Sequence, residues 1–279
     1  MEPLPNNVFV KQGVQDGPTL ALVAGVHGNE RVGVMALQAL WPTLEITKGT
    51  VYAIYGNPEA IAKNVRFIEK NLNRCFIAGN VGTSLEERQA RELMPILDQC
   101  DAVLDLHATN SVKTTPFIIT EQPSMDLARA LDFPIISTGW NEAEGGAVDG
   151  YVYERGKIAV TTELGSTKTP ELYLDLAKQS IIAFLRFYGC IEGEVPTPTQ
   201  TPKYVHIVRS VLKQTNALRF TKDFADFEAL FEGEVFAKDG DTEYRAGKKE
   251  CIIFPRPEKE IGGEAFLIGK FLETGDGNL

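Results

Sequence analysis

The first two thirds of this 279-residue chain alternate short apolar segments with longer amphipathic ones, which limits the folds open to it. The short segments are rich in β-branched residues and several are apolar on both faces, which is typical of strands covered by helices on both sides. Alternating strands and helices indicate an α/β domain with a mixed, largely parallel sheet covered by helices. We predict strands at 19–26, 50–55, 101–106, 116–120, 133–137 and 157–162.

Three longer segments between these strands have helical periodicity, at 30–40, 85–97 and 171–188. The second is preceded by Ser84 and followed at the third helical position by Glu87, which is a capping-box pattern. The third begins just after Thr169-Pro170 and stops before a glycine, which is the usual start and stop chemistry of a helix.

A proline-rich segment separates this region from the rest of the chain. Residues 194–202 hold three prolines, and the sequence beyond them shows short strand patterns divided by turn signals. We therefore predict an α/β domain over 1–193, a linker over 194–203 and a small β-rich domain over 204–279. The strands predicted in the last domain lie at 204–212, 229–236, 251–254 and 264–271.

Charge and cysteine content exclude several classes of protein. The net charge of −10 argues against a nucleic-acid or anionic-membrane partner, which would need a basic face. The four cysteines form no C-x-x-C pair, which suits a reducing cytosol. The N-terminus has no signal-peptide pattern and no segment approaches the roughly 20 apolar residues of a membrane span. We expect a cytoplasmic protein.

Two of the three histidines stand where a metal site would need them. His27 and Glu30 lie three residues apart between a predicted strand and a predicted helix, and His107 ends another predicted strand. Active groups of such sheets gather at the carboxyl ends of the strands. A single histidine in a loop is more often an ordinary polar residue, but this combination favours a metal site. The third, His206, lies in the β-rich part and is better explained by packing or exposure.

Two imidazoles and one carboxylate favour zinc over magnesium, although manganese, cobalt or ferrous iron could bind the same set. Three protein ligands leave a position for water, as in catalytic zinc sites. Glu163 follows the strand at 157–162 and is a candidate base, with a salt-bridged loop residue as the alternative. The segment after the predicted strand at 50–55 contains Arg66, Asn73 and Arg74. These residues could bind carboxylates or form a solvated basic loop.

Five short motifs occur in one order along the first domain. They are Gly25-Val26-His27-Gly28-Asn29-Glu30, Gly56-Asn57-Pro58, Asn71-Leu72-Asn73-Arg74-Cys75-Phe76, Asp105-Leu106-His107 and Thr162-Glu163-Leu164-Gly165. Together they resemble the succinylglutamate desuccinylase/aspartoacylase family, a branch of the zinc carboxypeptidase fold. The resemblance covers roughly residues 19–190, and a β-rich tail is also a feature of that family.

The resemblance implies a role for each candidate residue. His27, Glu30 and His107 would hold one zinc ion per chain. Glu163 would be the general base and later the acid that protonates the leaving amine. Arg66 would polarise the amide carbonyl and stabilise the oxyanion. The implied reaction is the hydrolysis of a small-molecule N-acyl amino acid to a free acid and an amino acid.

The resemblance also implies that Asn73 and Arg74 bind the α-carboxylate of the substrate. Asn71 stands where the family usually has aspartate, which removes a carboxylate that could support the loop. Aspartoacylases read the acyl-side carboxylate with a tyrosine and an arginine upstream of the base, and Tyr151 and Arg155 lie in that neighbourhood. Members of this family often form dimers, so a homodimer is open to this chain.

Three functions follow from this pattern. The first is zinc-dependent deacylation of an N-acyl amino acid of acidic character. The second is a metallocarboxypeptidase acting on short peptides with the same groups. The third is a catalytically silent binding protein that keeps the fold. The β-rich tail favours the first, because in this family it narrows the cleft to small substrates.

Overall fold

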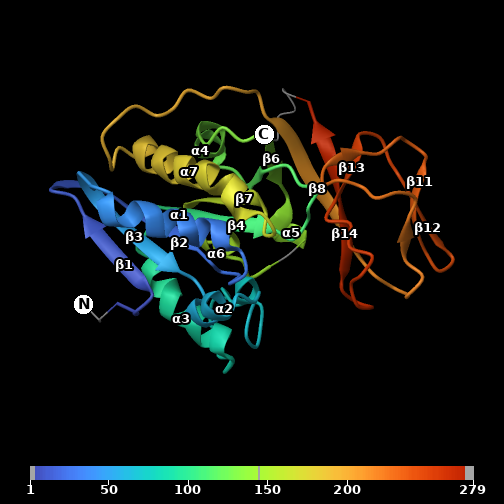
Figure 1. The fold of residues 1–279 in the computed structure, drawn as a ribbon, viewed down its shortest axis with the longest axis horizontal. Coiled ribbons are helices and arrows are strands. Elements are labelled where there is room, and N and C mark those ends of the chain that lie inside the picture. The colour runs from blue at the N-terminus through green and yellow to red at the C-terminus, as the bar shows by residue number, and fades with distance from the viewer. Residues whose placement is uncertain (1–3, 144, 274–279) are drawn as a thin grey trace.

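A single mixed sheet organises the computed structural model, which describes residues 4–143 and 145–273. Figure 1 shows helices packed around one part of the sheet and a β-rich part beside it. The eleven strands follow the order β1 (Val8–Gln12), β3 (Lys48–Tyr55), β2 (Gln15–Ala24), β4 (Ala102–Thr109), β7 (Ile158–Ser166), β5 (Phe117–Ile119), β6 (Ile135–Thr138), β8 (Lys203–Leu212), β14 (Glu264–Leu272), β13 (Glu250–Ile253) and β10 (Glu228–Ala229).

The centre of the sheet is parallel. Strands β3, β2, β4 and β7 pair in parallel, and so do β5, β6 and β8. Strand β1 is antiparallel to β3, and β5 is antiparallel to β7. The prediction of a mixed, largely parallel sheet covered by helices is therefore confirmed.

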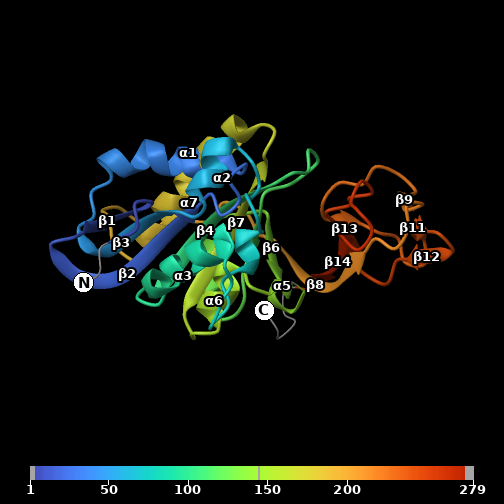
Figure 2. The same cartoon turned by 90° about the horizontal axis from the view of Figure 1, so that it is seen from below.

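Helices cover both faces of this sheet, and the alternation of side chains along β2 shows how. Leu20 and Leu22 pack with α1 (Arg31–Leu40) and α7 (Leu174–Phe187) in one core cluster. Ala21 and Val23 pack with α3 (Leu85–Leu97) and α6 (Val148–Tyr153) in a second cluster. Figure 2 shows α1 and α7 on one side of the strands and α3 and α6 on the other. Strands buried on both faces need apolar residues at every position, which is the pattern in the sequence.

The short helices of the chain complete these layers. They are η1 (Trp41–Thr43), α2 (Pro58–Lys63), η2 (Leu72–Arg74), α4 (Met125–Ala130), α5 (Trp140–Ala143) and η3 (Pro170–Tyr173). The predicted helix at 85–97 is confirmed together with its capping box, in which Ser84 and Glu87 exchange hydrogen bonds. The predicted helix at 171–188 begins as η3 and continues as α7.

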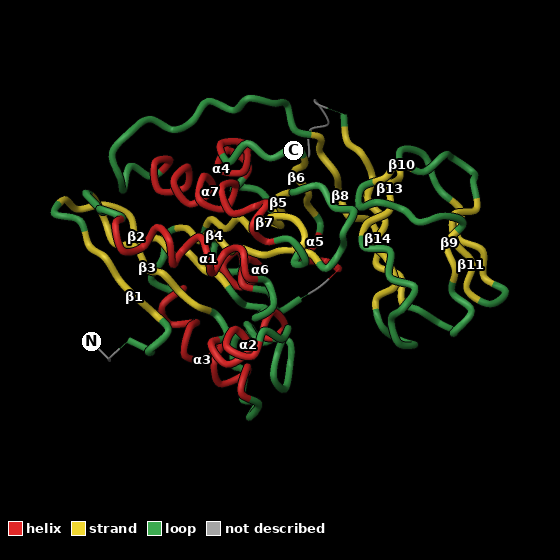
Figure 3. Tube along the Cα trace, viewed as in Figure 1, coloured by secondary structure: helices red, strands yellow, loops and turns green. Residues whose placement is uncertain are grey.

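The sheet continues into the β-rich part. Strand β8 pairs with β6 on one side and with β14 on the other. A second sheet, with the order β12 (Thr242–Arg245), β11 (Val235–Asp239) and β9 (Arg219–Phe220), lies farther out. Beyond β8, the described chain consists of strands and loops (Figure 3). The segment at 194–202 has no helix or strand and runs outside α7 (Figure 1). The division at 193 and 204 stays a prediction.

Several strand boundaries differ from the prediction, and three of the differences affect the site or the β-rich part. Strands β4 and β7 continue past His107 and Glu163, because their pairing extends to Thr109 and Ser166 across an irregular register. The single strand predicted at 229–236 is wrong. A turn closed by a hydrogen bond of 2.9 Å from Glu234 N to Phe231 O divides it into β10 and β11.

Candidate metal centre and active site

The first two candidate ligands lie on a tight turn between β2 and α1. Glu30 N donates to His27 O at 3.1 Å, and both side chains are almost completely buried. Gly28 is required here, because a Cβ at this position would lie 2.0 Å from the carbonyl carbon of Ala60. The turn therefore packs against α2 and directs the His27 and Glu30 side chains to the same point.

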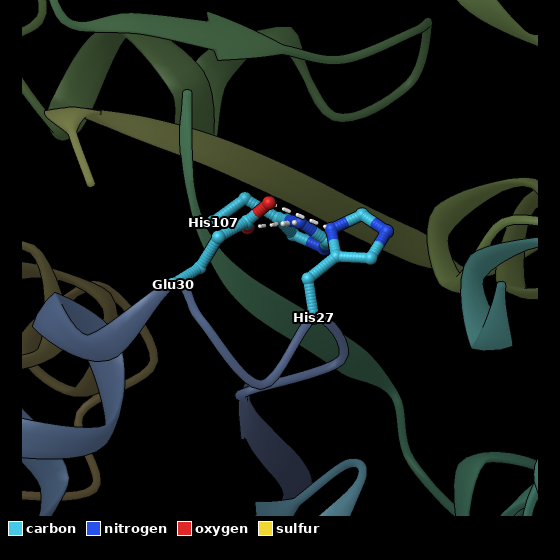
Figure 4. Close-up of side chains that lie close together, drawn as sticks. All are labelled: His27, Glu30 and His107. Atoms are coloured by element: carbon cyan, nitrogen blue, oxygen red, sulfur yellow. Dashed lines mark hydrogen bonds and ion pairs between the residues drawn. The ribbon is translucent and has the colours of Figure 1, made fainter. Parts of the chain in front are cut away.

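The third candidate ligand meets them from the neighbouring strand β4. His27 Nδ1 lies 2.8 Å from Glu30 Oε1, and His107 Nδ1 lies 2.9 Å from Glu30 Oε2. Figure 4 shows the Glu30 carboxylate in contact with both imidazole rings. The three possible ligand atoms all lie within 4.8 Å of one another. Residues that are 77 positions apart in the sequence thus converge on one buried point.

The outer nitrogens of both rings are also held. His27 Nε2 lies 2.9 Å from Asn71 Oδ1, and His107 Nε2 lies 2.9 Å from Asp105 Oδ2. Such outer partners fix the tautomer and the orientation of a metal-binding imidazole. The amide of Asn71 therefore occupies a place that supports His27, and its replacement of the family's usual aspartate lowers the negative charge there.

The electrostatics of the cluster favour a cation. Although burial opposes it, the Asp105 and Glu30 carboxylates raise the pKa of His107 well above its usual value. Burial tends to raise the pKa of Glu30, but the two imidazoles hold it well below its usual value. Burial lowers the pKa of His27. Two carboxylates around one imidazole stabilise positive charge, and a divalent metal would supply it in place of a proton.

The donor set fits a borderline divalent metal. Imidazole nitrogen and carboxylate oxygen are the ligands of catalytic zinc sites, which keep one coordination position open. Here the donors are buried, convergent and supported by outer hydrogen bonds. His27, Glu30 and His107 therefore fit such an ion.

Glu163 lies beside this cluster on β7, where it is the register partner of His107. Its Oε2 is buried and has no hydrogen-bond partner within the described chain. Burial and the nearby charge of Glu30 raise the pKa of Glu163 to about 8. A carboxyl group with such a pKa and an unused oxygen is suited to exchanging protons near neutral pH.

The three basic-loop candidates reach the same cavity. Arg66 Nη1 lies 3.1 Å from Glu30 Oε1 and keeps over a third of its side chain exposed. Asn73 Oδ1 accepts a hydrogen bond from Val148 N at 3.2 Å, and Arg74 Nη1 donates to Asn73 O. The cavity has a volume of about 350 Å³ and is lined by His27, Glu30, Arg66, Asn73, Arg74, His107 and Glu163 among others.

A buried carboxylate holds the loop that carries these residues. Glu86 is fully buried and accepts hydrogen bonds from Ile68 N at 2.7 Å, Glu69 N at 3.2 Å and Lys70 N at 3.0 Å. Its Oε1 also accepts from Asn57 Nδ2 at 3.1 Å. Sequence reasoning did not identify this role, because a glutamate in the first turn of a helix is usually solvent-exposed.

Other cavity residues escaped sequence reasoning as well. Trp140 and Asp149 line the cavity from α5 and α6, and Arg256 and Lys259 line it from the loop between β13 and β14. No sequence pattern marked them, since each becomes part of the site only through tertiary packing. Tyr151 and Arg155 instead contact Asp98 at 2.9 and 2.5 Å and do not line the cavity.

The described residues contain no helix that is both long enough and apolar enough to span a bilayer.

Comparison with known proteins gives the same family for both parts of the chain. Residues 16–187 match the succinylglutamate desuccinylase/aspartoacylase catalytic domain, and residues 203–269 match the AstE/AspA barrel-sandwich hybrid domain. The chain is 30% identical to the N-alpha-acetyl-L-2,4-diaminobutyric acid deacetylase of Halomonas elongata, over 95% of this chain and 85% of that relative. It is 26% identical to a succinylglutamate desuccinylase of Pseudomonas syringae, over 92% and 84% of the two chains.

A solved structure has the same fold. The crystal structure of succinylglutamate desuccinylase from Vibrio cholerae superposes with a TM-score of 0.79 at 21% identity, covering 95% of this chain and 85% of that one. The named relatives are deacylases that act on small acylated amino acids. The order of the five motifs, the architecture and both domain matches agree: the chain belongs to the succinylglutamate desuccinylase/aspartoacylase family.

Proposed function

We propose that this protein is a zinc-dependent amidohydrolase that cleaves the amide bond of an N-acyl amino acid. The observation that carries the proposal is the convergence of His27, Glu30 and His107 beside Glu163, whose Oε2 has no partner in the described chain. The names of the relatives support deacylation as the reaction.

The three convergent side chains would hold one zinc ion per chain. When bound, such an ion acts as a Lewis acid that activates water near neutral pH. The hydrogen bonds that the outer nitrogens of both imidazoles donate to Asn71 and Asp105 would fix the orientation of the rings.

Glu163 moves the proton in this proposal. Its carboxylate accepts a proton from the attacking water as the new C–O bond forms at the amide carbon. It then delivers that proton to the amide nitrogen as the C–N bond breaks, so that the products are a carboxylic acid and an amine. In the metal-free protein burial and Glu30 raise the pKa of Glu163 to about 8, and the positive charge of a bound ion would lower it again, so that one group can both accept and return a proton near neutral pH.

The arginines orient the substrate and stabilise charge. Arg66 lies against Glu30, is partly exposed and lines the cavity, which supports a role for its guanidinium in stabilising the oxyanion that forms from the amide carbonyl. Asn73 and Arg74 would bind the α-carboxylate of the amino-acid portion.

The size of the cavity favours deacylation over peptide trimming. Its volume of about 350 Å³ lies at the lower end of ligand sites, and residues of the C-terminal part such as Phe254 and Arg256 close one side of it. A small acylated amino acid suits this space better than a peptide. All four cysteines are buried free thiols, which supports the proposed cytoplasmic location.

A substrate panel and one variant test the proposal. We expect the zinc-loaded protein to hydrolyse at least one of N-acetylaspartate, N-succinylglutamate and Nα-acetyl-2,4-diaminobutyrate. Activity on short peptides alone would instead indicate a carboxypeptidase. Glu163→Gln should keep its zinc and lose about 10²- to 10⁴-fold in kcat.

The matched control is Glu154→Gln, which neutralises an exposed carboxyl group outside the cavity and should keep full activity. Elemental analysis of the purified protein tests whether it binds one metal ion per chain. Less than one metal ion per chain, with no gain of activity on adding zinc, would support a silent binding protein and overturn the proposal.

A further inference from the structure

Part of the cavity wall carries a carboxyl group that the proposed reaction does not use. Beyond Glu163, the wall continues along β7 to Thr161 and is completed by α5, α6 and β5. We call this part the inner wall, and its members are Ile119, Trp140, Asn141, Ala147, Asp149 and Thr161. Asp149 is the one ionisable residue among these six.

No lysine or arginine pairs with Asp149. Only 6% of the residue is exposed, and its Oδ1 accepts a hydrogen bond from Gly150 N at 2.8 Å. Within the described chain Asp149 forms no ion pair, although the charges of Asp105 and His107 act on it. Burial, reinforced by the charge of Asp105, raises the pKa of Asp149. A buried carboxylate without a paired lysine or arginine is costly, so the ammonium group of a ligand would supply a direct partner.

A purely structural role does not explain why this residue is charged. Asp149 lies in the first turn of α6, where carboxylates are mildly favoured. Its hydrogen bonds with Gly150 N and with the side chain of Thr161 could equally be made by asparagine. What distinguishes aspartate from asparagine at this position is the negative charge that it presents at the cavity wall.

Another part of the cavity lining is cationic. Arg256 and Lys259, on the loop between β13 and β14, line it together with Arg66. Arg256 Nη1 lies 3.4 Å from Glu264 Oε1, while Lys259 has no ion pair within residues 4–143 and 145–273. Burial and the charges of Arg256 and Arg66 lower the pKa of Lys259, as expected where positive charges accumulate. The cavity lining thus carries cations on the loop between β13 and β14 and a carboxyl group on α6.

Resting on the function proposed above, we propose that the substrate is an N-acylated diamino acid whose side-chain ammonium group binds Asp149. Its α-carboxylate is bound by Asn73 and Arg74, as proposed above, so that both charges of a zwitterionic substrate are matched. The cationic loop residues Arg256 and Lys259 add to the attraction for that carboxylate. This departs from the acidic substrate expected from the sequence. Because the cavity measures about 350 Å³, the side chain and the acyl group must both be short.

The first test compares three substrates of similar size on the zinc-loaded wild-type protein. They are Nα-acetyl-L-2,4-diaminobutyrate, N-acetyl-L-norvaline, which ends in a methyl group in place of the ammonium group, and N-acetyl-L-aspartate. We expect kcat/KM for the ammonium-bearing substrate to exceed the other two by about tenfold or more. Equal rates with the norvaline derivative, or a preference for the aspartate derivative, would overturn the inference and leave the proposed deacylase function standing.

The second test changes the charge of the inner wall. Asp149→Asn keeps the shape and should raise KM for the diaminobutyrate derivative by about tenfold or more, with the norvaline derivative changed less than about twofold. Asp149→Glu should retain the preference. Asp98→Asn is the matched control, because this carboxylate contacts Tyr151 and Arg155 of the same region outside the cavity. An equal loss on all substrates in Asp149→Asn would show a structural role and contradict the inference.

Binding measurements separate this inference from the proposed chemistry. Calorimetric titration of the zinc-loaded Glu163→Gln protein with the same three compounds reports affinity without turnover. Tighter binding of the diaminobutyrate derivative supports the inference even where no compound is hydrolysed, which would refute only the deacylase function. Equal affinity for all three compounds would overturn the inference that Asp149 binds a substrate ammonium group. Because these measurements need no change at Asp149, they decide the matter even if Asp149→Asn does not fold.

Discussion

Glu86 offers the sharpest test of how the active-site loop is held. In Glu86→Gln, one oxygen remains to accept from Asn57 Nδ2 and Ile68 N, but an amide NH₂ replaces the oxygen that accepts from Glu69 N and Lys70 N. Two backbone donors in partly buried hydrogen bonds then face another donor. An unsatisfied group costs about 1–3 kcal/mol when buried and less where water reaches it, so the free energy of unfolding should fall by about 2–4 kcal/mol.

Such a loss is a large share of the stability of a typical domain. Thermal unfolding should show a decrease in Tm on the order of 10 °C, and hydrogen exchange should accelerate at the amides of Ile68, Glu69 and Lys70. Activity should also fall, because the same loop carries Arg66 and Arg74. The control is Glu59→Gln, which removes only an exposed ion pair of 4.0 Å with Lys63 and should cost less than about 0.5 kcal/mol.

The effect should depend on pH with a definite sign. Although burial opposes it, the hydrogen bonds from Ile68 N and Asn57 lower the pKa of Glu86 below its ordinary value of 4.5. Its contribution to stability is therefore present above that value and lost as pH falls through the folded-state pKa. The difference in the free energy of unfolding between wild type and Glu86→Gln should become smaller as the pH falls into the acid range. A difference below about 1 kcal/mol at neutral pH would refute the reasoning.

Three further predictions concern the site itself. In the metal-free protein, burial and the Glu30 carboxylate raise the pKa of Glu163 from 4.5 to about 8, so the folded state binds one more proton than the unfolded state between these pH values. The free energy of unfolding should therefore fall as pH rises from 4.5 to about 8. Urea titrations should show that this free energy depends less on pH in Glu163→Gln. Zinc affinity should weaken as pH falls, because His107 must lose its proton to bind the metal. Although burial opposes it, the Asp105 and Glu30 carboxylates raise the pKa of His107. Competition with a chelator at several pH values measures the affinity, and an affinity that does not change with pH would contradict the prediction. Gly28→Ala should cost about 3 kcal/mol or more in thermal unfolding, because its Cβ would overlap the backbone of α2, whereas Gly145→Ala, with open space around it, should have little effect.

Local patterns in the sequence predicted much of the architecture. The apolar runs at 19–26 and 101–106 became β2 and β4, and the capping box before Leu85 fixed the start of α3. These features depend on residues that are neighbours in the chain, through side-chain alternation and capping hydrogen bonds. The site candidates His27 and Glu30 could be identified for the same reason, since one tight turn brings them together.

Tertiary structure decided what the local pattern did not contain. The short helices α5 and α6 were not predicted, because helices of four and six residues are stabilised by packing rather than by their own periodicity. Trp140 and Asp149 on these helices consequently escaped notice, and so did Arg256 and Lys259 on the loop between β13 and β14. The sheet continues from β6 through β8 because two segments that are 68 residues apart pair in parallel, as His206 and Thr138 show.

The amino-acid sequence alone therefore determined most of the longer strands and helices of the α/β part and the identity of the metal-binding candidates. The elements follow from residue types at fixed short spacings, and the candidates from histidines and a glutamate at the ends of predicted strands. Only the tertiary structure decided the shape and charge of the cavity, the burial of Glu86 beneath the active-site loop and the presence of Asp149 in the cavity lining. These depend on contacts between segments far apart in the chain, whose free energies arise from the burial of charge and from packing that no local pattern records.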